Sequence, residues 1–234
     1  MRKLVYIVLT VMALAACTGR TAPAPAPEMD SSDFVEVAEA VPDAILEIRY
    51  YSTYNFIGDR IDGYEAPVAL ITKEAAEALK KASDALLTEG YRLKIFDAYR
   101  PQTAVNHFIR WAEDVDDTRM KPLFYPDVDK SRLFELEFIC ARSSHSRGST
   151  VDLTLFDMAS GKEVDMGGTF DWFGEKSHPD YKGVTGEQAR MRGTLRKAMM
   201  DAGFKPFTTE WWHFTLADEP FPDTYFDFPV NYLP

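Results

Sequence analysis

Two histidines, one aspartate and one glutamate stand in two short segments whose residue types could support metal-dependent hydrolysis. The first segment, SSHSRGSTVD, has the pattern S-x-H-x-x-G-x-x-x-D and contains His145 and Asp152. The second segment, EWWH, contains Glu210 and His213. Two histidines and one aspartate can hold a catalytic zinc that keeps its fourth position open for water. Glu210 is then a candidate general base for that water.

Each segment alone also has a structural interpretation. A histidine among serines and a glycine is often a hydrogen-bonded loop residue, and a histidine beside two tryptophans often belongs to the core. Glu210 could orient His213 instead of acting as a base. We interpret the two other histidines, His107 in an apolar helical pattern and His178 before a proline, as structural. The sequence has no H-E-x-x-H, which excludes the helix-borne zinc protease pattern.

A loop followed by a strand is one way to bring His145 and Asp152 to one metal. We expect His145 in a loop, with Gly148 supplying backbone freedom and Asp152 near the start of a strand over residues 151–156. Both ligands would then be held from the same end of that strand.

The position of Glu210 raises a geometric problem. The last strand is expected over residues 209–216, and Glu210 and His213 are three residues apart. In a regular strand they would point to opposite faces. We therefore expect Glu210 to lie in a turn before pairing begins, or at a bulge that redirects it.

The rest of the pattern mixes helices and strands without a regular βαβ repeat, and no G-x-G-x-x-G or P-loop is present. Helices are expected over residues 72–88, 102–113 and 185–202, and strands over 34–51 (one or two), 91–96 and 134–141. Thr72, Gly90 and a Thr185–Gln188 capping box are the expected helix-end signals. We predict an α+β fold in which a central antiparallel sheet carries the metal site and helices pack against it.

Four motifs resemble the VanX-type D-alanyl-D-alanine dipeptidases, a zinc family related to lysostaphin-type peptidases, D-Ala-D-Ala carboxypeptidases and the hedgehog signalling domain. They are SSHSRGSTVDLTL, EWWH, DAYRP and YFDFPV. The resemblance runs from about residue 41 to residue 230, with the motifs in the same order and spacing. It implies zinc as cofactor, hydrolysis of a small D-amino-acid dipeptide, and a metal-activated water with Glu210 as base.

The resemblance also assigns roles outside the metal cluster. Arg100 matches an arginine that stabilises the oxyanion formed at the scissile carbonyl. Asp171 matches a position suited to the substrate ammonium, and Tyr50 matches a tyrosine close to the substrate. Ser143 is a donor beside the zinc motif. For Arg100 the alternative is a structural salt bridge, with Asp97 as a candidate partner.

Two other functions fit parts of the pattern. A D,D- or L,D-carboxypeptidase that trims peptidoglycan stem peptides would use the same chemistry in an open groove, whereas residues 114–132 and 161–181 could instead roof a small closed pocket. A non-catalytic, hedgehog-like zinc-binding module would have no need of Glu210 and Arg100. A serine hydrolase is disfavoured because G-x-S-x-G is absent.

The first residues resemble a bacterial lipoprotein signal. A basic start and an apolar run end in Leu14-Ala15-Ala16-Cys17, in which Cys17 would become the lipid-modified first residue; the alternative is an ordinary signal peptide cut elsewhere. We expect a signal over residues 1–16, the lipidated cysteine and a Pro/Ala-rich linker over 17–33, and one catalytic domain over 34–234. This arrangement predicts an extracytoplasmic protein, held at a membrane only by its N-terminal lipid.

Charge and cysteine content limit the partners. The chain has 26 basic and 37 acidic residues, a net charge of −11. Such a charge argues against a nucleic acid or an anionic membrane surface as partner. With Cys17 lipidated, Cys140 has no cysteine to pair with inside the chain, and its apolar neighbours indicate a buried small hydrophobic residue.

Overall fold

A computed structural model describes residues 30–234. The expected signal, Cys17 and most of the linker lie outside the described residues. The elements are, in chain order, β1 (Phe34–Glu36), α1 (Val37–Ala40), β2 (Ile45–Leu46), β3 (Leu70–Thr72), α2 (Lys73–Thr88), β4 (Tyr91–Asp97), α3 (Gln102–Glu113), α4 (Lys121–Phe124), η1 (Lys130–Arg132), η2 (Ser144–Arg147), β5 (Thr150–Asp157), β6 (Lys162–Glu163), η3 (Glu175–Ser177), α5 (Gly186–Asp201), β7 (Phe204–Pro206) and β8 (His213–Leu216).

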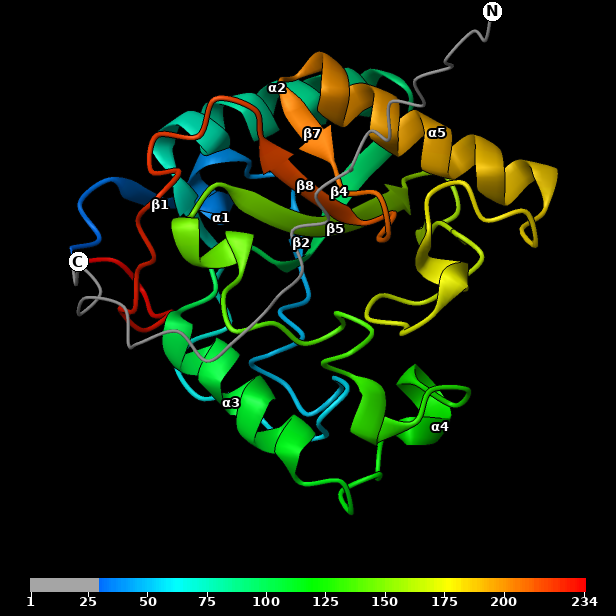
Figure 1. Ribbon diagram of the computed structural model, residues 1–234. Helices are drawn as coiled ribbons and strands as arrows, with labels where there is room; N and C mark the ends of the chain where they lie inside the picture. Colours follow the sequence, from blue (N-terminus) through cyan, green and yellow to red (C-terminus); the bar gives the residue numbers. More distant parts are fainter. Residues whose placement is uncertain (1–29) are drawn as a thin grey trace, which may run out of the picture.

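A six-stranded sheet forms the centre of the fold (Figure 1). Its strand order is β2-β4-β5-β8-β7, and β6 pairs with β5 outside this path. Only the β2–β4 pair is parallel, and the other pairs are antiparallel. Strands β1 and β3 form a separate antiparallel pair. The predicted α+β fold with an antiparallel-rich central sheet is therefore confirmed.

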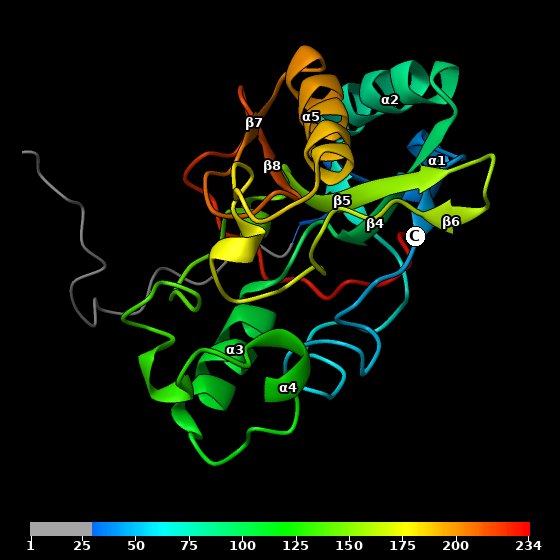
Figure 2. The same cartoon turned by 90° about the vertical axis from the view of Figure 1, so that its right-hand side faces the viewer.

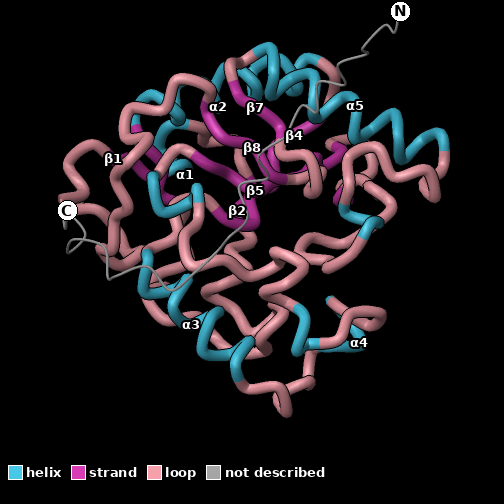
Figure 3. Tube along the Cα trace, in the orientation of Figure 1, coloured by secondary structure: helices cyan, strands magenta, loops and turns pink. Residues whose placement is uncertain are grey.

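Helices α2 and α5 lie side by side over one face of this sheet, and α3 lies on the opposite side (Figures 1 and 2). Between the sheet and α3 the chain consists largely of loops (Figure 3). Strand β5 is covered on both faces, because residues 150–155 are all buried. Val151, Leu153 and Leu155 alternate with Thr150 and Asp152, so apolar and polar side chains take opposite faces.

The helix ends follow the sequence signals, with one exception. The Thr185 hydroxyl and the Gln188 side chain form the expected capping box at the start of α5. Gly90 follows α2 with a φ of 87°, the left-handed conformation expected after a helix. Thr72 takes the N-cap position of α2, but its hydroxyl pairs with Ser149 (2.7 Å) instead of capping the helix.

The strand expected over residues 134–141 is wrong. The segment folds on itself, and the amides of Phe138 and Ile139 both donate to the Leu133 carbonyl. Its alternating hydrophobic residues resemble a strand, yet no sheet edge is beside them. Instead the Phe138 ring stacks on Phe173 at 5.0 Å, so an aromatic contact takes the place of a β-ladder.

Other boundaries differ because short elements depend on distant partners. The segment 34–51 contains α1 between two short strands, and the last strand begins at His213 instead of residue 209. Strand β7 was not expected; it exists through antiparallel pairing with β8. The segment 114–132 contains α4 and η1. Within residues 30–234, none of the helices has the length and apolar character needed to cross a membrane.

Candidate active site

The turn η2 carries His145 into the cluster. Ser143 begins this turn by accepting the His145 amide on its hydroxyl, and Gly148 ends it with a φ of 83°. A Cβ at Gly148 would lie 2.4 Å from the Phe34 ring, a distance that side chains do not reach without displacement. The turn therefore needs glycine for its backbone conformation, as the sequence indicated, and also for space.

His145, Asp152 and His213 converge from η2, β5 and β8. Asp152 and His213 are paired residues on adjacent antiparallel strands. The Nε2 atom of His145 is 3.1 Å from Asp152 Oδ2, and Nδ1 of His213 is 3.1 Å from Asp152 Oδ1. One donor atom from each of the three residues lies within 4.8 Å of the other two. The predicted ligands are thus brought together with their donor atoms facing a common point.

Hydrogen bonds on the far sides of the imidazoles fix which nitrogen faces the cluster. His145 Nδ1–H donates to the Ala98 carbonyl (2.6 Å), which leaves the Nε2 lone pair toward Asp152. On His213 the remote Nε2 atom is 3.2 Å from the Ser144 hydroxyl, so Nδ1 faces inward. Such outer partners orient metal-binding imidazoles. Neither partner was predicted from the sequence; Ser144 adjoins His145 in the motif, whereas the Ala98 carbonyl carries no sequence signal.

The donor set fits zinc. Asp152 Oδ1 is buried and has no hydrogen-bond partner, although it lies 3.1 Å from His213 Nδ1. Burial lowers the pKa of His145 to about 4, which keeps this imidazole neutral and able to bind a metal. Burial acts to raise the pKa of Asp152, but the two histidines outweigh it and hold the carboxylate ionised. A carboxylate and two imidazoles are ordinary ligands of catalytic zinc.

Glu210 lies in the turn before β8, as its spacing from His213 predicted. Its carbonyl accepts the His213 amide (3.4 Å), and its Oε2 atom lies 3.4 Å from His213 Nδ1. Burial raises the pKa of this carboxyl group, while the nearby His213 opposes the shift. A carboxylate beside the metal cluster with a raised pKa suits a general base.

Arg100 makes the salt bridge considered from the sequence and also borders the metal cluster. Its guanidinium donates to Asp97 Oδ2 from Nε (2.9 Å), which is the structural salt bridge. Its Nη2 atom also lies 3.4 Å from Asp152 Oδ2, so the cation borders the metal cluster. Asp97 accepts a further hydrogen bond from Tyr64 (2.6 Å), and burial raises the pKa of Asp97 to about 7. The contacts of Arg100 with Asp97 and with Asp152 hold the guanidinium in place.

Asp171 and Tyr50 form a second buried pair. The Tyr50 hydroxyl donates to the Asp171 carboxylate at 3.0 Å, and the Arg100 guanidinium lies 4.9 Å above the Tyr50 ring. Burial raises the pKa of Asp171 well above its ordinary value. Asp171 also has a φ of 60°, unusual for a residue with a side chain. An uncompensated buried carboxyl group of this kind would be stabilised by an incoming cation.

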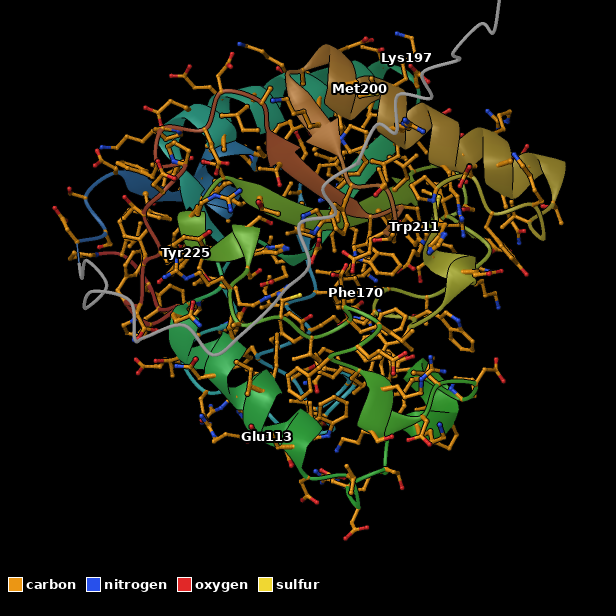
Figure 4. All side chains as sticks on the ribbon, viewed as in Figure 1. Glu113, Phe170, Lys197, Met200, Trp211 and Tyr225 are labelled. Carbon is orange, nitrogen blue, oxygen red and sulfur yellow. The ribbon has the colours of Figure 1, made fainter. Side chains whose placement is uncertain are left out.

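One cavity of about 510 Å³ is lined by the three predicted metal ligands together with Glu210, Arg100, Asp171, Tyr50 and Ser143. Its wall includes residues 137–140 and residues 171 and 173. The expected roof is therefore partly wrong: residues 114–132 do not line the cavity but support it, with Tyr125 stacked on Phe173. Cys140 is half-buried at the cavity wall, so the expectation of a fully buried residue is also wrong. Figure 4 shows the side chains that fill the space between the sheet and α3.

The family to which the chain belongs follows from a match over nearly all of the described residues. A family described as D-ala-D-ala dipeptidase matches residues 30–231. The chain belongs to this D-Ala-D-Ala dipeptidase family. The D-alanyl-D-alanine dipeptidase of Enterococcus faecium is 40% identical over 198 residues, 85% of this chain and 98% of the relative. That of Streptomyces coelicolor is 40% identical over 200 residues, 86% of this chain and 99% of the relative.

A solved structure of a vancomycin resistance D,D-pentapeptidase, VanY, in complex with Zn(II) is more distant from this member of the D-Ala-D-Ala dipeptidase family. It is 15% identical over 64% of this chain and 74% of its own, with a TM-score of 0.38. That likeness is too weak to bear on substrate or mechanism. The zinc assignment for this chain instead follows from its family and from its own His145, Asp152 and His213 cluster.

Proposed function

We propose that this protein hydrolyses D-alanyl-D-alanine to two molecules of D-alanine. The observation that carries the proposal is the grouping, in one cavity, of the metal cluster with Glu210, Arg100 and Asp171. Each group has a distinct task in cleaving a free dipeptide. The names of the Enterococcus faecium and Streptomyces coelicolor relatives support the same substrate.

The attacking water is activated between the metal cluster and Glu210. Zinc, when bound by His145, Asp152 and His213, supplies Lewis acidity to the water and the scissile carbonyl. The Glu210 carboxylate takes a proton from the attacking water and transfers it to the leaving amine nitrogen. The water oxygen bonds to the carbonyl carbon, the C–N bond breaks, and the two products are an amino acid from each side.

Arg100 stabilises the charge that develops during the attack. Its Nη2 atom lies 3.4 Å from the Asp152 carboxylate, so the guanidinium borders the point where the scissile carbonyl must sit. A donor fixed before the reaction by Asp97 does not have to reorganise as the oxyanion forms. The same salt bridge that looked like a purely structural alternative therefore serves the proposed role.

The dipeptide is oriented by its two charged ends. Asp171 and Tyr50 bind the ammonium, because a cation compensates the buried carboxyl group. Ser143, whose hydroxyl lies 3.5 Å from Arg100 Nη1, donates to the carboxylate end. A peptide extended at its N-terminus has no free ammonium at this position. Such a peptide would have to place its next residue against Asp171, which disfavours stem-peptide carboxypeptidase activity.

We also propose that the protein works outside the cytoplasm as a membrane-anchored lipoprotein. The support is the sequence Leu14-Ala15-Ala16-Cys17 after a basic start and an apolar run. A role in recovering D-alanine from cell-wall turnover suits that compartment. Removal of D-Ala-D-Ala before its incorporation into the wall would require the cytoplasm.

A substrate panel tests the proposed activity. The zinc-loaded protein is assayed with D-Ala-D-Ala, L-Ala-L-Ala, the two mixed dipeptides and a stem pentapeptide. We expect D-Ala-D-Ala to have the highest kcat/KM. A highest kcat/KM for the pentapeptide would assign the protein to the carboxypeptidases, and zinc binding without turnover of any substrate would assign it to the binding modules.

A further inference from the structure

The cavity lining includes residues beyond the metal cluster and beyond the groups assigned above to the two charged ends of a dipeptide. We define the inner arm as the part of the cavity lined by Tyr50, Phe173 and Asp171. Tyr50 and Phe173 both contact Phe56, and Tyr50 donates to Asp171. We define the outer arm by the lining residues beyond His213, which include Arg142, Arg147, Lys205, Thr215, Leu216 and Glu219. Cavities of about 300–1,000 Å³ hold ligands of drug size, and this one has about 510 Å³.

The outer arm is built on the same face of the sheet as the metal cluster. His213 and Thr215 are two residues apart in β8, so their side chains share a face at a separation of about 6–7 Å. Lys205 of β7 is the cross-strand partner of Thr215 and lies on that face as well. The outer arm therefore begins about 6–7 Å from the predicted metal ligand His213.

Two cations in this arm have no acidic partner. Arg147 is paired with Glu219 through two contacts of 2.8 Å, so both charges are compensated. Lys205, in contrast, donates only to the Ala217 carbonyl (3.3 Å). The Arg142 guanidinium lies 4.7 Å above a tyrosine ring, and no ion pair of Arg142 or Lys205 is found within residues 30–234.

The tyrosine ring under Arg142 restricts the position of its guanidinium. That ring belongs to Tyr225, which lies beside the turn η2 (Figure 4). A guanidinium stacked on an aromatic face keeps its N–H groups available at the edge for an anion. The other acids of the lining are Asp152 and Glu210 at the metal cluster, Asp171 in the inner arm, and Glu137, which is exposed. The outer arm thus offers uncompensated positive charge in a molecule with a net charge of −11.

We propose that the outer arm binds the side chain of the substrate's C-terminal residue, and that Arg142, assisted by Lys205, favours D-alanyl dipeptides whose second residue carries a side-chain carboxylate. The proposal rests on the proposed hydrolysis, which places the ammonium at Asp171 in the inner arm. With the scissile bond at the metal cluster, the second residue then faces the outer arm. The reaction itself is unchanged, and the second product is an acidic D-amino acid.

Two isosteric substrates test this specificity. The zinc-loaded protein is assayed with D-Ala-D-Glu and D-Ala-D-Gln, which differ in charge but hardly in shape. We expect kcat/KM to be higher for D-Ala-D-Glu at low salt, by up to about fivefold, the upper end for a solvent-exposed ion pair. The preference should shrink at high salt, because exposed charges are screened. Arg142→Gln should bring the ratio close to one, and Lys205→Gln should reduce it.

A matched control and a binding measurement complete the test. Lys182→Gln removes an exposed cation outside the cavity lining and should leave the ratio unchanged. Calorimetric titration of both dipeptides into zinc-loaded Glu210→Gln protein should show the same preference without turnover. A ratio near one in the unaltered protein, or a preference that survives the Arg142→Gln and Lys205→Gln double change, would overturn the proposal. If D-Ala-D-Ala is not hydrolysed, the proposed function fails, and the calorimetric ratio still decides whether the arm selects acidic residues.

Discussion

Glu210 lies beside the metal cluster without belonging to it. Its carboxylate is 3.4 Å from His213 Nδ1, whereas the three donor atoms of the cluster come from His145, Asp152 and His213. Glu210→Gln keeps the size and a hydrogen-bonding oxygen but cannot accept a proton. We expect kcat on D-Ala-D-Ala to fall by about 10²–10⁴-fold, the usual contribution of general acid–base catalysis.

The zinc content of the same variant distinguishes a base from a ligand. Glu210→Gln should still hold about one zinc per chain in elemental analysis, because two histidines and one aspartate fill three sites and water the fourth. His145→Ala, measured in parallel, should lose tightly bound zinc. Loss of zinc from Glu210→Gln would make Glu210 a ligand or an essential support of His213. Retention of both zinc and activity would mean that another residue is the base.

We expect Arg100 to combine a catalytic role with support of the buried Asp97 carboxylate. Arg100→Ala should lower kcat by about 10²–10³-fold, as removal of one oxyanion donor typically does. Zinc should remain bound, since Arg100 is not one of the three predicted metal ligands. Thermal stability should fall too, because buried Asp97 loses the cation that lies 2.9 Å away.

Arg100→Lys separates the two effects. It keeps the positive charge but loses the planar fork that contacts both Asp97 and Asp152. We expect the melting temperature of Arg100→Lys to lie between those of Arg100→Ala and the unaltered protein. Its kcat should stay low. An Arg100→Ala variant with normal kcat would leave only the structural role.

At the scale of elements, we expect the segment 161–181 to select which peptides can enter. It places Asp171 against Tyr50, where the substrate ammonium is expected. N-acetyl-D-Ala-D-Ala and stem pentapeptides lack that ammonium, so we expect their kcat/KM to be at least about 30-fold below that of D-Ala-D-Ala, as for loss of one partner of a buried charge pair. Asp171→Asn should reduce this difference in kcat/KM, because it should lower kcat/KM for the free dipeptide only. Equal kcat/KM for the free and acetylated dipeptides would contradict the assignment of Asp171.

At the scale of the whole molecule, the proposed lipoprotein signal would determine where the enzyme works. If Cys17 is the acylated N-terminus, the full-length protein should fractionate with membranes when it is expressed in a bacterium. Cys17→Ser should remain unprocessed or appear in the soluble fraction. The catalytic domain should be unaffected, and equal kcat/KM on D-Ala-D-Ala for both purified proteins checks this. A Cys17→Ser protein that is processed and fractionates like the unaltered protein would show that the anchor lies elsewhere.

The sequence alone was sufficient for the features that are local or carried by rare residue types. The Gly90 signal after α2 and the capping box of α5 involve residues within a few positions of one another. The metal-binding residues stood out because His145, Asp152 and His213 occur in spacings that suit one zinc. Even the turn at Glu210 followed from a local argument, the alternation of side chains along a strand.

The tertiary structure decided everything that depends on contacts between distant segments. Residues 134–141 alternate like a strand, but Phe138 finds an aromatic partner in Phe173 and no sheet edge. Strand β7 is only three residues long and exists because β8 pairs with it. The Ala98 carbonyl that orients His145, and the outer arm beside Thr215, also have no local signature. A backbone carbonyl and a cavity are defined by what the folded chain places next to them, which residue order alone does not specify.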